Sequence, residues 1–206
     1  MMHVHLWRVA LDRPARHDWL SGEERDRAAG FMRPADAQHF AACRSALRGI
    51  LGQRIGMCPA AVPIMQPAGH RPESIPHVPF SVSHTGNRAL VAVAASGIVG
   101  ADLEQVLGRR TDWLAAQLSP AERIRGCEDL LLRWVCKEAA LKATGYGLAL
   151  DAAQVVVPVG RARCRILLTQ PKPRFWHLST FAPWPDFVAA LVTDRAHEAA
   201  FHDWVN

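Results

Sequence analysis

Two similar segments, 98 residues apart, constrain the fold of this 206-residue chain more than any other feature. Residues 20–25 and 118–123 both match a capping box, with serine at the N-cap and glutamate three residues later. At the same offset, residues 40–45 fall on residues 138–143. Two halves built alike are the simplest interpretation. The alternative is coincidence between capped, alanine-rich helices, which are common. If the repeat is real, Phe40 stands where Glu138 does, so the first half lacks that acid.

The first half is predicted to open with a strand and continue with two helices. The expected elements are a strand near 3–9, helices near 22–31 and 35–55, and strands at 80–83 and 89–95. Between them, six prolines from Pro59 to Pro79 exclude a regular element. The Ser96-Gly97 turn is expected to pair strand 89–95 with a strand at 98–104.

The second half is predicted to hold a capped helix near 120–126 and a long helix near 128–144. Gly145 follows the long helix and is a plausible C′ residue. Apolar runs at 154–159, 164–169, 175–181 and 187–193 are spaced like an antiparallel meander. Mixed elements of this kind predict an α+β architecture.

Composition limits the classes of partner and compartment. The net charge is +5 and the pI about 9.3, which favours an anionic partner: phosphates, an acidic protein or nucleic acid. Five cysteines without a C-x-x-C pair argue against a disulfide framework or a zinc site, and favour a reducing cytosol. The first residues lack a signal-peptide pattern, and no stretch reaches transmembrane length.

Two carboxylates spaced two apart, Asp102 and Glu104, lie on the predicted strand 98–104. Residues i and i+2 of a strand share a face, roughly 6.5 Å apart, so one hard cation can reach both. A solvated sheet edge is the alternative for such a pair. The strand is otherwise apolar, however, and like charges held close need a cation to offset them. Ligation by oxygen alone favours magnesium, with manganese as the second choice.

Glu138 and Lys142 are four residues apart on the predicted long helix, so they share one face. An ion pair of this spacing contributes only about 0.3 kcal/mol, so helix stability is a weak reason for it.

His84 follows Ser81 and Ser83 and precedes Thr85, at the end of a predicted strand. A lone histidine is more often structural than a ligand. Three hydroxyls converging beside it are nevertheless what a phosphate group requires. Arg71, after Gly69 and His70, adds a cation, and no Walker-type or G-x-G-x-x-G loop occurs.

In this order and spacing, the chain resembles the 4′-phosphopantetheinyl transferases, specifically their larger, surfactin-synthetase-activating class. The matching segments are Arg71-Pro72, Phe80 to Thr85, Val99 to Glu104, and Trp134 to Leu148 with its W-x-x-K-E-A-x-x-K pattern. The resemblance spans about residues 20–148. It implies a pseudo-dimer of two similar α+β halves, each a small antiparallel sheet packed on a long helix. The halves would be residues 1–98, with coenzyme A phosphate contacts, and 99–206, with the metal site and catalytic helix.

The resemblance also implies the reaction: 4′-phosphopantetheine moves from coenzyme A to a serine of an apo acyl or peptidyl carrier protein, releasing 3′,5′-ADP. Asp102, Glu104 and Glu138 would bind magnesium. Glu138 would act as general base, and Lys142 would neutralise or protonate the leaving phosphate.

The coenzyme A phosphates would be held by residues of the first half together with Lys142. The residues expected there are Arg71, Ser83 and His84, with Arg27 and Arg44 as further candidates.

The chain departs from the family pattern at three places. The family usually has Gly-Lys-Pro at residues 70–72, where this chain has His70-Arg71-Pro72, so a guanidinium replaces a point charge. Ser81 replaces an asparagine, and Ala101 replaces a bulkier aliphatic residue. None of these is a proposed metal ligand. Trp134 is expected to pack in the core.

A surface for the carrier protein is expected between the metal strand and the second capping box, because such carriers present an acidic helix. The expected surface residues are Leu107, Arg109, Arg110, Trp113 and Leu114. Because both half-sites lie in one chain, a monomer is expected.

Three other functions fit parts of the pattern. A metal-dependent phosphohydrolase would use the same acids on a nucleotide or on coenzyme A. A nucleic-acid-binding module fits the basic pI but lacks a clustered basic run with interleaved aromatics, so no nucleic acid is expected as partner. A transferase that has lost activity but still binds coenzyme A conflicts with the presence of all three acids and Lys142.

Overall fold

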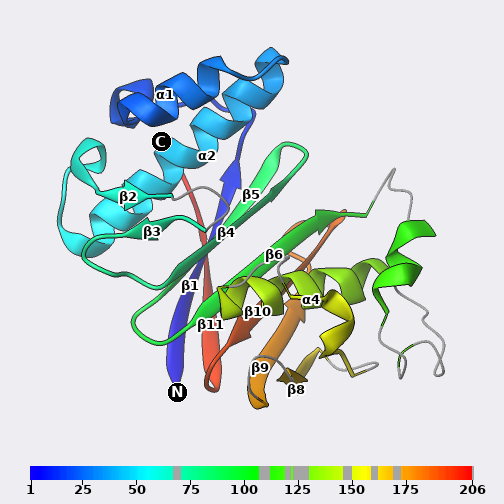
Figure 1. The fold of residues 1–206 in the computed structure, drawn as a ribbon. Coiled ribbons are helices and arrows are strands. Elements are labelled where there is room, and N and C mark those ends of the chain that lie inside the picture. Colours follow the sequence, from blue (N-terminus) through cyan, green and yellow to red (C-terminus); the bar gives the residue numbers. More distant parts are fainter. Residues whose placement is uncertain are drawn as a thin grey trace.

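The computed structural model of the chain describes residues 1–66, 71–106, 112–118, 122, 130–145, 150–158, 162–168 and 173–205. Its strands form two main sheets, each covered by one long helix, α2 (Pro34–Ile55) or α4 (Leu130–Thr144) (Figure 1). The mixed α and β architecture expected from the sequence is confirmed. None of the described helices has the length and apolar character needed to cross a membrane.

The first sheet contains four strands in the order β11-β1-β5-β4. These strands are β11 (His197–Asp203), β1 (Met2–Ala10), β5 (Arg88–Ala94) and β4 (Phe80–Thr85). β1 and β4 pair with β5 in antiparallel fashion, whereas β11 pairs with β1 in parallel, Met2 opposite His197. The sheet is therefore mixed rather than antiparallel, and its outer strand comes from the end of the second half.

The second sheet contains five strands in the order β6-β10-β9-β8-β7, all antiparallel. These strands are β6 (Val99–Gln105), β10 (Phe187–Thr193), β9 (Arg174–Phe181), β8 (Arg163–Leu168) and β7 (Val155–Val156). The predicted meander from β7 to β10 is confirmed.

One predicted strand pairing is wrong. The Ser96-Gly97 turn does reverse the chain, with Gly97 at φ +84°, but β5 and β6 belong to different sheets. β5 is bonded to β1 on one side and to β4 on the other, so it has no free edge for β6. β6 pairs with β10 instead. The proline-rich loop also holds two short paired strands, β2 (Ile64–Met65) and β3 (Glu73–Ser74), where no regular element was expected.

Capping residues set the helix ends. At the start of α1 (Gly22–Ala29), the Ser21 hydroxyl accepts a hydrogen bond from the Glu24 amide, while the Glu24 carboxylate accepts one from the Ser21 amide. The first predicted capping box is thus confirmed; most of the second lies outside the described residues. Gly56 and Gly145, which follow α2 and α4, have φ +70° and +81°, as expected of C′ glycines.

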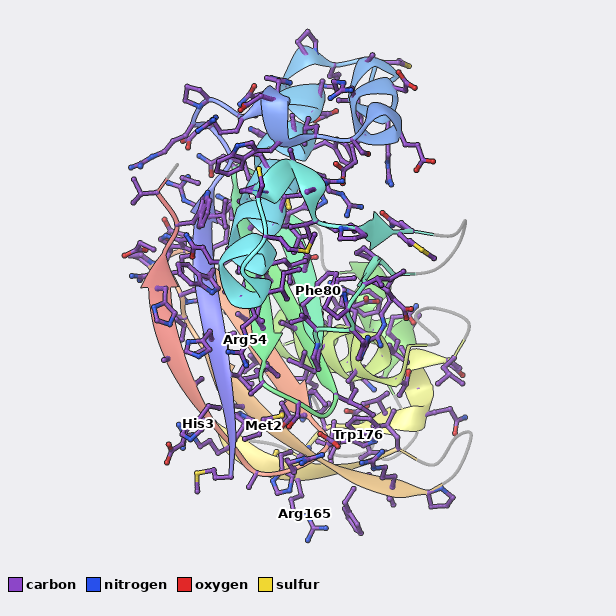
Figure 2. The ribbon with its side chains drawn as sticks, turned by 90° about the vertical axis from the view of Figure 1, so that its left-hand side faces the viewer. Met2, His3, Arg54, Phe80, Arg165 and Trp176 are labelled. Atoms are coloured by element: carbon purple, nitrogen blue, oxygen red, sulfur yellow. The ribbon has the colours of Figure 1, made fainter. Side chains whose placement is uncertain are left out.

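Three apolar clusters fill the interior. One lies between α2 and the first sheet, the second between α4 and the second sheet, and the third between the two sheets. Phe80 belongs to the first cluster and Trp176 to the second (Figure 2). Along β5, residues 89, 91 and 93 face α2, while 90, 92 and 94 face the other sheet. The strand alternation therefore joins all the layers into one continuous core.

A buried glutamate anchors each long helix. Glu24 accepts a hydrogen bond from Arg48 Nε at 2.6 Å. Glu122, 98 residues later, lies 2.8 Å from Lys137 Nζ and 3.2 Å from Arg133 Nη1. In both cases the helix cation also donates to backbone carbonyls of the segment that follows the helix, Val62 for Arg48 and Ala152 for Lys137. These bonds satisfy charges that would otherwise be costly to bury.

Candidate active site

Asp102 of β6 lies where the two sheets and α4 meet. Its side chain is buried, with 4% of the residue exposed. Its Oδ1 atom accepts hydrogen bonds from Ser83 Oγ of β4 at 2.7 Å and from Lys142 Nζ of α4 at 2.6 Å. The structure therefore brings together three residues that the sequence predicted for the site, Asp102, Lys142 and Ser83. Ser83 contacts the acid directly, a contact that the sequence did not predict.

Three carboxylates share this region. Glu104 lies two residues beyond Asp102 on β6, and Glu138 precedes Lys142 by one turn of α4. Burial raises the pKa of Glu138, and the negative charges of Asp102 and Glu104 raise it further, while Lys142 opposes them. The acids are thus close enough to repel one another, as expected for the three predicted metal ligands.

The donor atoms fit a hard dication. Asp102 Oδ2 and Glu138 Oε1 are buried and have no hydrogen-bond partner in the described structure. Unpartnered buried oxygens are costly, and a cation would satisfy both and relieve the repulsion between the carboxylates. The described residues contain no ready-made cluster of three protein ligands. Magnesium does not require one, because it usually retains several waters and binds one or two carboxylates together with substrate phosphates.

Gly100 lets α4 approach β6 closely enough for these contacts. A Cβ atom at residue 100 would collide with the Ala139 carbonyl oxygen and the Ala143 backbone. These two alanines lie on the helix turns that carry Glu138 and Lys142. The glycine therefore sets the distance between the acids of the strand and those of the helix.

A cluster of basic side chains faces the acids from the first half. The pKa of His84 is lowered by burial and then by the positive charges of Lys142, Arg44, His39 and Arg27. The ring remains accessible to solvent although protein surrounds it on most sides. Three of the predicted phosphate ligands, His84, Arg44 and Arg27, thus converge from β4, α2 and α1. Their combined charge favours an anion at this place.

Arg27 and Arg44 already share one acceptor. Both guanidinium groups donate to Gln66 Oε1, and both lie over the Phe40 ring, at 5.0 and 5.5 Å from its centroid. The Phe40 ring limits the movement of the two arginine side chains, and the Gln66 side-chain oxygen accepts hydrogen bonds from both guanidinium groups. No pattern in the sequence predicted the contacts of Gln66 or the role of Phe40.

Arg71 reaches the same region from the proline-rich loop. Its Nη1 donates to the Lys142 carbonyl oxygen at 3.4 Å, and its Nε lies 3.7 Å from Glu73 Oε1. The guanidinium therefore lies at the C-terminal end of α4, where a cation is favoured. Residues 67–70, which precede it, lie outside the described residues.

Lys137 stands beside Glu138 in the sequence but points elsewhere. It is 1% exposed and donates to Glu122 and to the Ala152 carbonyl oxygen. It is a structural residue of the helix core. Trp134 packs against the cluster beneath α4, as expected.

The predicted carrier surface is only partly described. Leu107, Arg109 and Arg110, like the side chain of Trp113, lie outside the described part of the chain. Leu114 is 3% exposed, so its expected place on that surface is wrong. It lies in the short helix η3 (Asp112–Gln117), which packs against α4.

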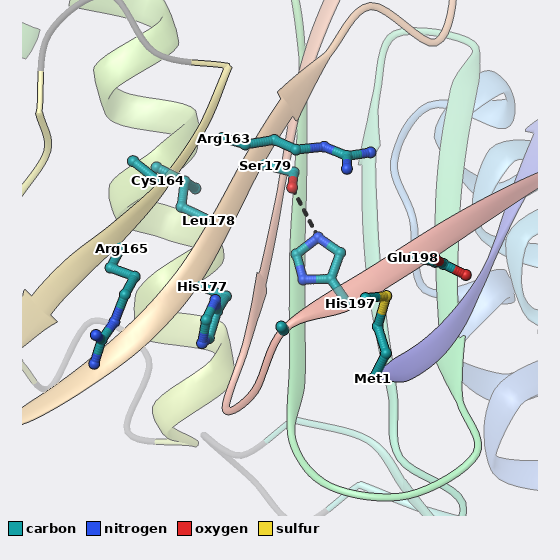
Figure 3. Close-up of a pocket in the computed structure, with 10 residues that line it drawn as sticks. Met1, Arg163, Cys164, Arg165, His177, Leu178, Ser179, His197 and Glu198 are labelled. Carbon is teal, nitrogen blue, oxygen red and sulfur yellow. Dashed lines mark hydrogen bonds between the residues drawn. The ribbon is translucent and has the colours of Figure 1, made fainter.

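A separate cavity of about 410 Å³ lies along β8, β9 and β11, and His197 forms part of its wall (Figure 3). The Thr193 hydroxyl donates to the Arg195 carbonyl oxygen, so it accepts from His197 Nδ1, and His197 Nε2 accepts from the Ser179 hydroxyl. Burial lowers the pKa of His197 to about 4, aided by the charges of Arg163 and His177. This neutral histidine joins three strands, and the hydrogen bonds described for its ring go to hydroxyl groups rather than to a carboxylate.

The chain is similar in sequence to known proteins. Residues 98–192 match the family described as the 4′-phosphopantetheinyl transferase superfamily. The chain is 34% identical over 214 residues to the 4′-phosphopantetheinyl transferase HetI of Nostoc, covering 91% of this chain and 86% of that protein. It is 28% identical over 192 residues to a Synechocystis protein that is provisionally named as the same kind of transferase, covering 85% and 78%.

Proposed function

Because the chain belongs to the 4′-phosphopantetheinyl transferase superfamily, we propose that it moves 4′-phosphopantetheine from coenzyme A to a serine of an apo acyl or peptidyl carrier protein. The other product is 3′,5′-ADP. The observation that carries the proposal is the meeting of Asp102, Glu138 and Lys142 opposite the basic side chains of His84, Arg44 and Arg27. The carboxylates that would bind the metal ion thus lie opposite the basic side chains that would bind the phosphates, where the two halves meet.

The first half supplies the anion site in this proposal. Arg27 and Arg44 would exchange the Gln66 oxygen for oxygens of a coenzyme A phosphate, which binds guanidinium groups more strongly than a neutral amide does. His84 would donate to the same group, and Arg71 would hold the phosphates nearer to Lys142. Ser83 would act mainly by orienting Asp102.

The second half supplies the chemistry. A magnesium ion held by Asp102, Glu104 and Glu138 would neutralise charge on the pyrophosphate. Glu138, whose pKa is raised, would accept the proton of the carrier serine as its oxygen attacks the phosphorus that bears the pantetheine arm. The bond between that phosphorus and the bridging oxygen breaks, and Lys142 would neutralise or protonate the released phosphate of 3′,5′-ADP.

We further propose that the enzyme belongs to the larger, surfactin-synthetase-activating class, as a pseudo-dimer within one chain. The strand orders β1-β5-β4 and β6-β10-β9 support this, since β6 begins 97 residues after β1 and β10 begins 99 residues after β5. The buried glutamates Glu24 and Glu122 support it at the same offset. A monomer working in the cytosol on an acidic carrier fits the +5 net charge and the free cysteines of the described residues.

The decisive experiment incubates the purified protein with coenzyme A, magnesium and an apo carrier protein, and measures the carrier by mass spectrometry. We expect a mass gain of one phosphopantetheine group, lost in Glu138→Ala and retained in the exposed control Glu198→Ala. Consumption of coenzyme A without any carrier would instead identify a phosphohydrolase. No gain with several carriers, or a full gain in Glu138→Ala, would overturn the assignment or the role of Glu138.

A further inference from the structure

A pair of histidines joins β1 to β11 far from the acids of the active site. His5 Nδ1 and His202 Nε2 lie 2.9 Å apart; His5 is exposed and His202 is partly exposed. The two rings therefore direct one nitrogen each at a common point. The parallel pairing of the strands, with Trp7 opposite His202, fixes the separation of the two backbones.

The His202 ring is held in place by an aromatic neighbour. Trp7 stacks on it with centroids 4.6 Å apart and an interplanar angle of 28°. Trp7 in turn meets Trp204 edge-on at 6.0 Å, and Trp204 belongs to the buried cluster under α2. One of the two ligand rings is thus oriented by the core, so little side-chain freedom is lost when it binds a ligand.

We propose that His5 and His202 form a binding site for a divalent transition metal ion, with zinc as the physiological candidate. Neutral imidazole is the most common side-chain ligand for such ions. Two nitrogens on a tetrahedral zinc, each about 2.05 Å from the metal, lie about 3.3 Å apart, so the pair needs to open by only a few tenths of an ångström. The ion takes the place of the proton that the two rings share.

Water completes the coordination shell. Among the described residues, no third histidine, cysteine, aspartate or glutamate side chain joins the two histidines in a ready-made metal cluster. His3 lies on the same face of β1, but it stands opposite Glu198 in the register. Its Nδ1 atom lies 3.7 Å from Glu198 Oε2. Burial lowers the pKa of His5, and the charges of His202, Arg54 and His3 lower it further. Of these, Arg54 at the end of α2 would oppose a bound cation. Figure 2 shows Arg54 and His3 along β1.

A metal at this place would tie β11 to β1, the only strand with which it pairs among the described residues. The ion would therefore stabilise the attachment of residues 197–203 to the first sheet. This effect is independent of the transferase reaction and of its magnesium site.

The test measures zinc binding by calorimetry on the full chain, with excess magnesium to saturate the acidic site. A Cys58→Ser background removes an exposed thiol that could compete for zinc. We expect His5→Gln and His202→Gln each to weaken zinc binding at least tenfold, and His3→Gln to change it less than twofold. Arg54→Gln should tighten it, because it removes an opposing charge.

Thermal denaturation provides a second readout. Zinc should raise Tm in the parent protein and in His3→Gln, but not in His5→Gln/His202→Gln, while circular dichroism shows that the variants are folded. Zinc affinity that is unchanged in both single variants, or that falls equally in His3→Gln, would overturn the proposal.

Discussion

Ser83 Oγ lies 2.7 Å from Asp102 Oδ1, although the two residues belong to edge strands of different sheets. Two residues earlier on β4, Ser81 Oγ accepts a hydrogen bond from the Ala101 amide at 2.9 Å. The two serines thus connect β4 to β6 by side chains where no backbone pairing exists. The bond to Ser81 holds the two strands together, and the bond from Ser83 orients Asp102 in the active site.

The Ser83→Ala variant should lose this orientation. A hydrogen bond to a charged group contributes about 1.5–3 kcal/mol, so stability falls by up to that amount. Asp102 then keeps only Lys142 on Oδ1, and we expect a higher magnesium concentration for half-maximal activity. Ser81→Ala is the matched control: it should lower Tm without moving the magnesium dependence. Equal magnesium curves for Ser83→Ala and the parent protein would contradict the role given to Ser83.

Gly100→Ala should separate α4 from β6. The added methyl group meets backbone atoms of Ala139 and Ala143, which cannot turn away as a side chain could. We expect a loss of about 1–3 kcal/mol in the free energy of unfolding, with transferase activity falling at least tenfold in the protein that still folds. Gly22→Ala is the control, because no atom lies within 4 Å of a Cβ there. Chemical denaturation and initial rates measure the two effects.

Glu138→Gln should stabilise the metal-free protein while abolishing activity. Burial raises the pKa of Glu138 in the folded state above its ordinary value of 4.5. At pH values between 4.5 and the raised pKa, the folded protein therefore binds more protons than the unfolded chain. Stability therefore falls as the pH rises through this window and stays lower above it. Replacing the carboxylate by an amide removes this loss of folding stability at pH 7. Loss of a general base reduces the catalytic rate by about 10²–10⁴.

Melting curves with and without magnesium check this prediction. In EDTA at pH 7, Glu138→Gln should melt at a higher temperature than the parent protein. Magnesium should raise the Tm of the parent protein more than that of the variant, because one ligand is missing. A variant that melts lower than the parent in EDTA would show that burial of the ionised carboxylate is not destabilising.

Anion binding should be accompanied by proton uptake at His84. In the free protein, burial and the surrounding cations lower the pKa of His84 below 6.5, so the ring is neutral at pH 7. A bound phosphate group reverses the local charge and raises that pKa. Titration of 3′,5′-ADP at pH 6.5 in buffers of different ionisation enthalpy should therefore show uptake of up to one proton. His84→Asn should reduce the uptake, and His177→Asn, on the second sheet, should not.

Local patterns in the sequence predicted most elements of the fold. The capping box at Ser21, the glycine after α4 and the positions of β4 and β6 depend on residues close together in the chain, and the structure agrees with them. Which strands pair with one another depends on residues that are far apart in the chain. The turn at Gly97 reverses the chain, but nothing near it tells that β5 is already bonded on both edges.

β11 was not predicted at all, because His197 to Asp203 shows no regular alternation of apolar and polar residues. It is held at an edge by backbone bonds to β1, which any sequence can make.

For the site, the resemblance to the transferase family predicted which acids and basic residues meet. It could not predict that Ser83 bonds to Asp102 or that Gln66 holds two arginines, because each contact joins separate elements. It also could not tell that Lys137 is buried while its neighbour Glu138 faces the site; this depends on the position of Glu122.

The pairing of β1 with β11 also sets an order of events during synthesis. β11 begins 195 residues after β1 in the chain, so the outer edge of β1 stays uncovered until residues 197–203 have been added. While the residues between the two strands are being made, the nascent chain carries an open strand edge that another chain could occupy. Chaperone binding to the nascent first half is therefore expected to persist until β11 has been made.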